Sequence, residues 1–225
     1  MKLSELAWVS FIFANLTRHD PTYQALISDG SFLSKLRTKP SLVEFQRVRD
    51  FLAHYRVPWA PKDLAQKYLT VWPALKPYIE QLSSESLIAC DLESKEIQDA
   101  ILHAYSYLQW PHVWGGDTVT SKTLHWFNTS FFIMWDENIQ TSYRKFGAQG
   151  YLEFLKIMQS HAIEALNDFE QLSLPMQLDE VLSSQLGYPT TRPLVKLLDD
   201  YNWIIITKGW PPNIPNWLLE LFPHA

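Results

Sequence analysis

Apolar residues recur at intervals of three and four along most of the chain, which is the spacing of one face of an α-helix. Over residues 41–57 this face consists of Leu42, Phe45, Val48, Phe51, Leu52 and Tyr55. Over residues 94–109 it consists of Ile97, Ile101, Leu102, Tyr105 and Leu108. Both stretches therefore predict helices that bury one side.

Residues typical of helix ends support this pattern. Asp20 and Pro21 are suited to the N-cap and the first position of a helix, and Gly30 favours the end of that helix. Ser41 and Glu44 have the spacing of a capping box, so another helix is expected to begin there.

Prolines and glycines divide the rest of the chain into shorter helical pieces. Pro73 and Pro77 are expected to interrupt the pattern, which leaves two short helices over about 62–71 and 74–82. Further helices are predicted from near Thr120 or Ser121 to 128, from Asp136 to before Gly147, and over 150–171, 177–186 and 193–206.

One stretch, NWIIITKG over residues 202–209, has β-character, and no second clear strand is present to pair with it. We therefore predict an all-α, compact helical fold that forms a single domain over residues 1–225. The pattern also allows two lobes with a cleft between them, one made of 1–92 with 170–225 and the other of 93–169.

The composition narrows the class of protein. A chain of 225 residues with a hydrophobic share of 47% can bury a core of ordinary size. The single cysteine, Cys90, excludes an internal disulfide, and its apolar neighbours favour an inert, buried thiol. The apolar stretch 3–16 is shorter than the roughly 20 residues that span a bilayer. We expect a soluble, cytoplasmic protein.

The net charge of −5 is unevenly distributed along the chain. Residues 1–80 carry an excess of four positive charges, and residues 81–225 carry an excess of nine negative charges. A basic surface on an acidic protein is suited to phosphate groups, and the alternative is a solvated helix face. The positive charges concentrate at Lys35, Arg37, Lys39, Arg47, Arg49 and Arg56.

The stretch SKTLHWFNTSFFIMWDENI, residues 121–139, has an ionisable residue on each side of an apolar run. Lys122 lies in a predicted helix, and Asp136 follows Phe131–Trp135 at the expected start of the next helix. A helix over 94–109 and the glycine-containing turn VWGGDTVT precede it. This order, over residues 94–147, resembles the catalytic region of the helix-hairpin-helix DNA glycosylases.

The resemblance implies an enzyme that excises a damaged or modified base from DNA, in repair or in defence against modified foreign DNA. Asp136 would stabilise positive charge on the sugar or orient an attacking water. Lys122 would be the amine nucleophile of a bifunctional enzyme with lyase activity, whereas water would attack in a monofunctional one.

The same resemblance implies a partner and a binding pocket. The enzyme would flip the target base out of the DNA duplex, and aromatic rings would stack on it. The candidates for this pocket are Trp110, Trp114, Trp126 and Trp135. Contacts to the DNA backbone are assigned to the basic residues Lys35, Arg37, Lys39, Arg47, Arg49 and Arg56.

Several alternatives stay open at this point. Asp136 is also suited to a purely structural N-cap, Lys122 to an exposed helix surface, and His125 to a hydrogen-bonded structural role. A non-enzymatic helical module that binds a protein or nucleic acid is the rival function. The histidines lack a compact ligand spacing and no glycine-rich phosphate loop is present, so no metal and no cofactor is predicted. A monomer is favoured.

Overall fold

A computed structural model of the chain describes residues 1–16, 20–55, 61–109, 112–113, 116–171, 193–211 and 213–221. These ranges contain helices and no strand, which confirms the predicted all-α class. The helices are α1 (Leu3–Leu16), α2 (Asp20–Ile27), α3 (Gly30–Thr38), α4 (Leu42–His54), α5 (Leu64–Leu82), α6 (Lys95–Tyr107), α7 (Asp117–Phe127), α8 (Glu137–Tyr143), α9 (Gly147–Gln171), α11 (Leu194–Asn202), the π-helix η1 (Trp203–Thr207) and α12 (Asn216–Leu221).

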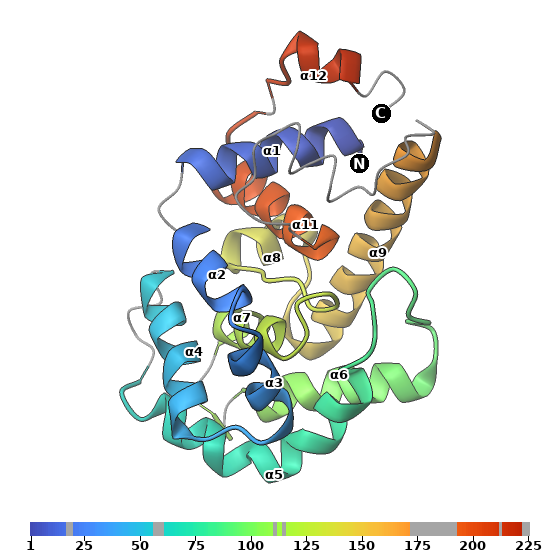
Figure 1. Cartoon of the computed structure of the whole chain (residues 1–225). Coiled ribbons are helices and arrows are strands. Elements are labelled where there is room, and N and C mark those ends of the chain that lie inside the picture. Colours follow the sequence, from blue (N-terminus) through green and yellow to red (C-terminus); the bar gives the residue numbers. More distant parts are fainter. Residues whose placement is uncertain are drawn as a thin grey trace.

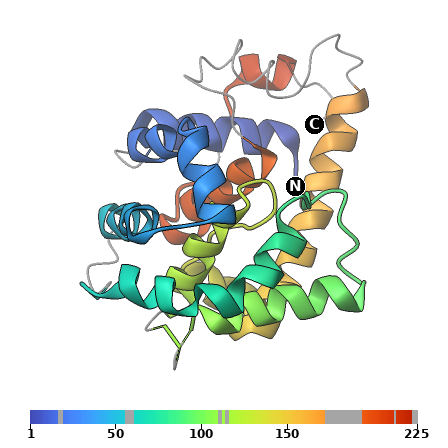
Figure 2. The ribbon, with the colours of Figure 1, turned by 60° about the horizontal axis from the view of Figure 1, so that its bottom comes forward.

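Helix α7 lies in the middle of the molecule, and other helices surround it (Figure 1, Figure 2). Helices α3, α4 and α6 contact α7, and α5 packs against both α4 and α6. Helix α1 packs against α11 and α9, so the first helix of the chain lies beside one of its last (Figure 1). The centre of the molecule is therefore enclosed by segments from both ends of the chain.

A large apolar core extends from Leu3 in α1 to Leu218 in α12, and a small second cluster of Val9, Phe13 and Ile204 lies between α1 and η1. The largest fully buried side chains of the large core include Trp126, Trp135 and Tyr151. The large core draws on residues from both predicted lobes, so among the described residues it does not divide along the boundary between them. The division into lobes stays a prediction.

The caps of α3 and α4 show how the sequence determines these helix starts. The side chain of Ser41 accepts a hydrogen bond from a backbone N–H of the first turn, and the Glu44 side chain accepts from the Ser41 N–H, so the predicted capping box is confirmed. The prediction for Gly30 was incomplete. Helix α2 ends at Ile27, and Gly30 begins α3, because Asp29 caps the new helix by accepting from the Phe32 N–H at 2.9 Å.

The two short helices predicted over 62–71 and 74–82 are one helix, α5, with Pro73 and Pro77 inside it. The prediction was wrong because proline disrupts a helix by removing one hydrogen bond and crowding one carbonyl, and both effects are tolerated where the affected backbone faces water. Both prolines lie on the exposed side of α5. The opposite side buries Trp72, Leu75 and Ile79, and this packing keeps the helix continuous.

Two helices begin three residues earlier than predicted. Helix α7 begins at Asp117 and α9 at Gly147. The Asp117 carboxylate accounts for both starts, because an acidic residue stabilises the first turn of a helix and this one also accepts from the Gly147 N–H at 3.1 Å. The predicted helix over 177–186 lies outside the described residues.

The stretch with β-character is helical. Residues Trp203–Thr207 form the π-helix η1, which continues directly from α11, so the helix predicted over 193–206 is confirmed. Three consecutive isoleucines favour a strand only where a neighbouring strand can pair with them, and the described residues offer none.

Candidate functional site

Lys122 lies in the second turn of α7, a helix that is buried almost throughout. Every residue from Val119 to Phe127 is buried. Polar side chains in such a position need hydrogen-bond partners inside the protein. Thr123 follows this rule, since its hydroxyl lies 2.7 Å from the Tyr68 hydroxyl and donates to the Val119 carbonyl at 2.8 Å.

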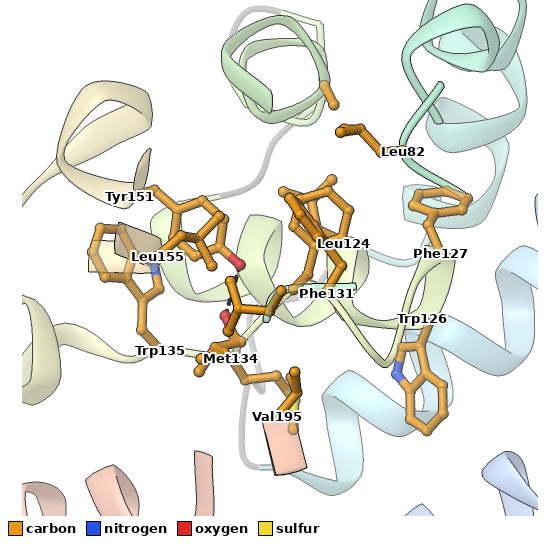
Figure 3. Close-up of a cluster of buried hydrophobic side chains, with 14 of the residues drawn as sticks. Leu82, Leu124, Trp126, Phe127, Phe131, Met134, Trp135, Tyr151, Leu155 and Val195 are labelled. Atoms are coloured by element: carbon orange, nitrogen blue, oxygen red, sulfur yellow. Dashed lines mark hydrogen bonds between the residues drawn. The ribbon is translucent and has the colours of Figure 1, made fainter. Parts of the chain in front are cut away.

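The segment Phe131–Trp135 crosses the interior as non-helical chain between α7 and α8. Its buried backbone groups require partners, and side chains of neighbouring helices supply them. His125 Nδ1 donates to the Phe132 carbonyl at 2.7 Å. The Tyr151 hydroxyl donates to the Ile133 carbonyl, also at 2.7 Å (Figure 3). These contacts explain how a non-helical segment can lie in the core.

Ser121 of α7 makes hydrogen bonds that hold together the two chain segments that carry Lys122 and Asp136. Ser121 Oγ donates to the Trp135 carbonyl at 3.2 Å and accepts from the Trp135 N–H at 3.1 Å. Each of these residues directly precedes one of the candidates, Lys122 and Asp136. The pair of hydrogen bonds therefore brings together two residues that are far apart on the chain.

Asp136 is the N-cap of α8, as predicted from its position. Its Oδ1 accepts from the Ile139 N–H at 3.0 Å. Its Oδ2 accepts from the Thr207 hydroxyl at 2.7 Å, at the end of η1. The carboxylate is half-buried and held through both oxygens, so its orientation is well determined.

Lys122 and Asp136 line the same pocket, which we call the Lys122 pocket. Free space inside it amounts to about 10 Å³, which is room for a single water molecule. Its walls are mainly aromatic and apolar and contain three ionisable side chains. The residues that line it are Phe13, Tyr55, Lys122, Met134, Trp135, Asp136, Ile139, Asp199 and Trp203.

The amine of Lys122 makes no hydrogen bond and no ion pair with any described residue. Lys122 is only 8% exposed, and its Nζ lies 5.0 Å from the centre of the Tyr55 ring. Burial lowers the pKa of Lys122, because the protein interior solvates an ammonium poorly. The carboxylates of Asp199 and Asp136 oppose this shift, and the positive charge of Lys196 adds to it.

A group of buried charges on α11 borders this pocket. Lys196 is fully buried, and its Nζ donates to Asp199 Oδ2 at 2.7 Å and to Asp200 Oδ1. Asp200 Oδ2 accepts from the Ser10 hydroxyl of α1 at 2.7 Å. Only Asp199 of this group lines the Lys122 pocket.

Asp199 was not among the residues predicted from the sequence. Its spacing from Lys196 is the ordinary one for an ion pair along a helix, which is usually exposed and contributes little. What distinguishes this pair is its burial under α1. That burial depends on long-range packing, so the local sequence carried no signal for it.

The tryptophans predicted to line a base pocket differ in position. Trp135 borders the Lys122 pocket, and its Nε1 donates to the Tyr105 hydroxyl at 3.2 Å. Trp126 is fully buried, and its ring centre lies 4.8 Å from that of Phe51. Figure 3 shows Trp126 and Trp135 on different sides of the apolar cluster. Trp110 and Trp114 lie outside the described residues.

Two arginines of the basic segment already have acidic partners within the protein. Arg47 donates to Asp29 at 2.7 Å and lies over the ring of Phe32. Arg49 lies 3.1 Å from Asp50. Their charges are therefore partly neutralised before any partner binds.

The lysines of the same segment are more available. Lys35 and Lys39 are exposed at the end of α3. Arg37, between them, is half-buried, and its Nε has no hydrogen-bond partner among the described residues. It borders an open hollow of about 410 Å³ that is also lined by Thr38, Glu80 and Ser83. Arg56 lies outside the described residues, and the assignment of this surface to a DNA backbone stays a prediction.

Two other ionisable side chains have the structural roles expected of them. His125 Nε2 lies 3.1 Å from the Tyr23 hydroxyl, and burial lowers the pKa of this histidine to about 3. Cys90 is buried, and burial raises the pKa of its thiol to about 12. A protonated, buried thiol is a poor nucleophile, and the buried imidazole has both ring nitrogens in contact with other groups of the protein.

Comparison of the chain with protein-family models, with curated proteins and with solved structures found no match. Within the described part of the chain, no group of three or more His, Cys, Asp or Glu side chains is placed to hold a metal ion. Among the described helices, none is both long enough and apolar enough to cross a bilayer. The geometry around Lys122 is therefore the main basis for assigning a function.

Proposed function

We propose that the protein is a DNA glycosylase-like enzyme that excises a damaged or modified base. Breaking an N-glycosidic bond develops positive charge on the sugar. Asp136 would stabilise that charge with its fixed carboxylate, and Lys122 would attack the sugar carbon as an amine and form a Schiff base. DNA would be the partner, and the basic segment around α3 and α4 would contact its phosphates.

The single observation that carries this proposal is the amine of Lys122, which has no hydrogen-bond or ion-pair partner among the described residues and lies in the same pocket as Asp136. A lysine becomes nucleophilic when it loses its proton, and burial favours the neutral form. Buried ionisable groups with shifted pKa values are more frequent in catalytic sites than elsewhere. The two residues also correspond to those that the resemblance to helix-hairpin-helix glycosylases selects.

The rival function, a non-enzymatic helical module, accounts for Asp136 as a cap but not for Lys122. Buried cationic groups are normally paired, because removing a charge from water without compensation costs several kcal/mol. A purely structural module gains nothing from a buried lysine that lacks a partner in the described part of the chain. This comparison favours an enzyme.

The size of the pocket adds a requirement to the proposal. A nucleobase is much larger than the single water molecule for which the Lys122 pocket has room. The pocket must therefore open when DNA binds. Two aromatic walls of the pocket lie at helix ends: Tyr55 at the end of α4 and Trp203 at the start of η1. Turns of π-helix such as η1 often occur at functional sites.

The test is a screen of the full chain against single-stranded and duplex DNA that carries oxidised, deaminated or alkylated bases. Alkaline cleavage detects abasic sites, and borohydride traps a Schiff base as a covalent adduct. We expect release of at least one base, with Asp136→Asn defective in release and Lys122→Ala defective in trapping. Lys145→Ala, at a surface lysine paired with Glu153, is the matched control.

The outcomes separate the two roles. Release without any adduct would assign the attack to water and give Lys122 a positioning role. A folded protein that releases no base from any substrate and binds no DNA would reject the proposal and favour the interaction module.

A further inference from the structure

We infer that Asp199, held in place by Lys196, is the proton acceptor for the amine of Lys122. This inference rests on the proposed function and adds a third residue to its site. It concerns what happens to the protons of the amine when a carbon–nitrogen bond forms.

Asp199 is the carboxylate of this region with one oxygen that accepts no hydrogen bond from the described residues. Both oxygens of Asp136 accept hydrogen bonds, from Ile139 and from Thr207. Asp199 lines the Lys122 pocket, and only its Oδ2 is engaged, by Lys196 at 2.7 Å. Its Oδ1 accepts no hydrogen bond from the described residues.

Asp200 is excluded by its position. It is fully buried, it does not line the Lys122 pocket, and its two oxygens accept from Lys196 and from Ser10. Lys196 therefore binds both carboxylates of α11 but leaves only one of them in contact with the pocket. This arrangement fixes the Asp199 side chain without using its second oxygen.

The pocket also supplies a path for the proton. Lys122 and Asp199 border the same space but form no ion pair, and the space has room for one water molecule. A water molecule there can accept a hydrogen bond from the amine and donate one to Asp199 Oδ1. Tyr55, Phe13 and Trp203 supply aromatic walls to this space.

The chemistry requires such an acceptor. When the amine attacks the sugar carbon, a C–N bond forms, and the base leaves with the electrons of the broken N-glycosidic bond. The nitrogen then carries a positive charge and loses a proton to Asp199 through the water. As the sugar ring opens, the nitrogen lone pair forms the C=N bond, the ring C–O bond breaks, and its oxygen takes up the proton.

The test uses formaldehyde and cyanoborohydride as the probe on the full chain, without DNA. Attack of Lys122 on formaldehyde forms a C–N bond and requires the same proton loss, and mass spectrometry of the peptide that contains Lys122 measures the rate of methylation. At neutral pH we expect Asp199→Asn to slow this rate by about tenfold or more and Asp200→Asn to change it by less than about twofold. Asp200→Asn is a matched control because it removes the other partner of Lys196.

If Asp199 acts only as a counter-charge, the methylation rate of Asp199→Asn should change in the opposite direction. If Asp199 only stabilised the ammonium, its removal would leave Lys122 neutral more often, and methylation would become faster. Chemical rescue adds a second criterion, since formate should restore the rate of Asp199→Ala and leave the native chain unaffected. An unchanged or faster rate in Asp199→Asn, or no response of Asp199→Ala to formate, would overturn the inference.

A result that overturns the role of Asp199 can be told apart from a result that overturns the proposed function. The formaldehyde reaction reports on the amine and its proton acceptor whether or not the protein excises a base. The screen on modified DNA decides the function independently.

Discussion

Ser121 and Trp135 exchange two hydrogen bonds in the protein interior, with the serine hydroxyl as donor to the Trp135 carbonyl and as acceptor from its N–H. A single side chain thereby satisfies both backbone groups of a buried, non-helical residue. Lys122 and Asp136 follow these two residues in the sequence, so the contact sets their relative position. This serine therefore supports the geometry of the candidate site.

We predict that Ser121→Ala destabilises the protein by about 1–3 kcal/mol, because it leaves a buried N–H and a buried carbonyl without partners. Urea unfolding measures the change in the free energy of unfolding. Ser160→Ala, at an exposed serine of α9, should change it by less than about 0.5 kcal/mol. Equal stability of both variants would show that the Trp135 backbone finds other partners.

Replacing the buried lysine of α7 should have the opposite effect on stability. We expect Lys122→Met to stabilise the fold by about 1–3 kcal/mol near neutral pH, since it removes a buried amine that has no hydrogen-bond or ion-pair partner among the described residues. The surface variant Lys67→Met, which breaks an exposed pair with Asp63, is the control and should change stability by less than about 1 kcal/mol.

The pH dependence gives a further check on Lys122. Its pKa is lowered in the folded state, so the unfolded chain binds more protons between that value and the ordinary lysine pKa of about 10.4. The native chain therefore gains stability from Lys122 as pH rises through this window. The advantage of Lys122→Met should shrink toward high pH, and a constant difference would contradict the lowered pKa.

His125 should make the fold sensitive to acid. Its pKa is about 3 in the folded protein and about 6.5 in the unfolded chain, so only the unfolded chain binds the proton between these values. Stability should fall as pH decreases from about 6.5 to about 3, with a contribution on the order of 5 kcal/mol. His125→Asn keeps a donor for the Phe132 carbonyl but cannot titrate. Unfolding measured at several pH values should show a smaller slope for this variant.

The sequence predicted those features that depend on neighbouring residues. The capping box of Ser41 and Glu44 and the N-cap at Asp136 follow from local hydrogen bonds, and both are present. The prolines of α5 were misjudged because the outcome depended on which side of the helix faced water. Asp199 was missed for a related reason, since its importance comes from burial under α1.

The proximity of Lys122 and Asp136 could not be derived from spacing alone. The resemblance to a known family suggested it, and the Ser121–Trp135 contact accounts for it physically. The same resemblance gave no indication of how small the pocket is. Pocket size depends on the rings of Tyr55 and Trp203, which come from distant parts of the chain.

The basic segment should give salt-sensitive binding to duplex DNA. Lys35 and Lys39 are exposed, so charge reversal to glutamate at both should weaken binding on all sequences and reduce its salt dependence, by about one unit in the logarithmic slope for each phosphate that the protein no longer neutralises. Reversal at Arg47 and Arg49 should also weaken binding, but less, because their charges are already paired.

Fluorescence anisotropy at several salt concentrations measures this effect. Lys156→Glu, on α9 and paired with Glu93, is the control and should leave affinity unchanged. If the native chain shows no detectable affinity for DNA at low salt, the result would contradict the glycosylase proposal.

The decisive variant is Asp136→Asn. Asparagine caps helices nearly as well as aspartate, its remaining oxygen can accept from Ile139, and its amide can donate to the Thr207 hydroxyl, so stability should change by less than about 1 kcal/mol. It removes the negative charge that would stabilise the sugar cation, so base release should fall by a factor on the order of hundreds. DNA binding should persist or tighten.

Glu137→Gln, which removes an exposed charge from the same helix start, should retain normal release. Single-turnover excision by folded Asp136→Asn at the native rate would remove this carboxylate from the mechanism and leave it a helix cap.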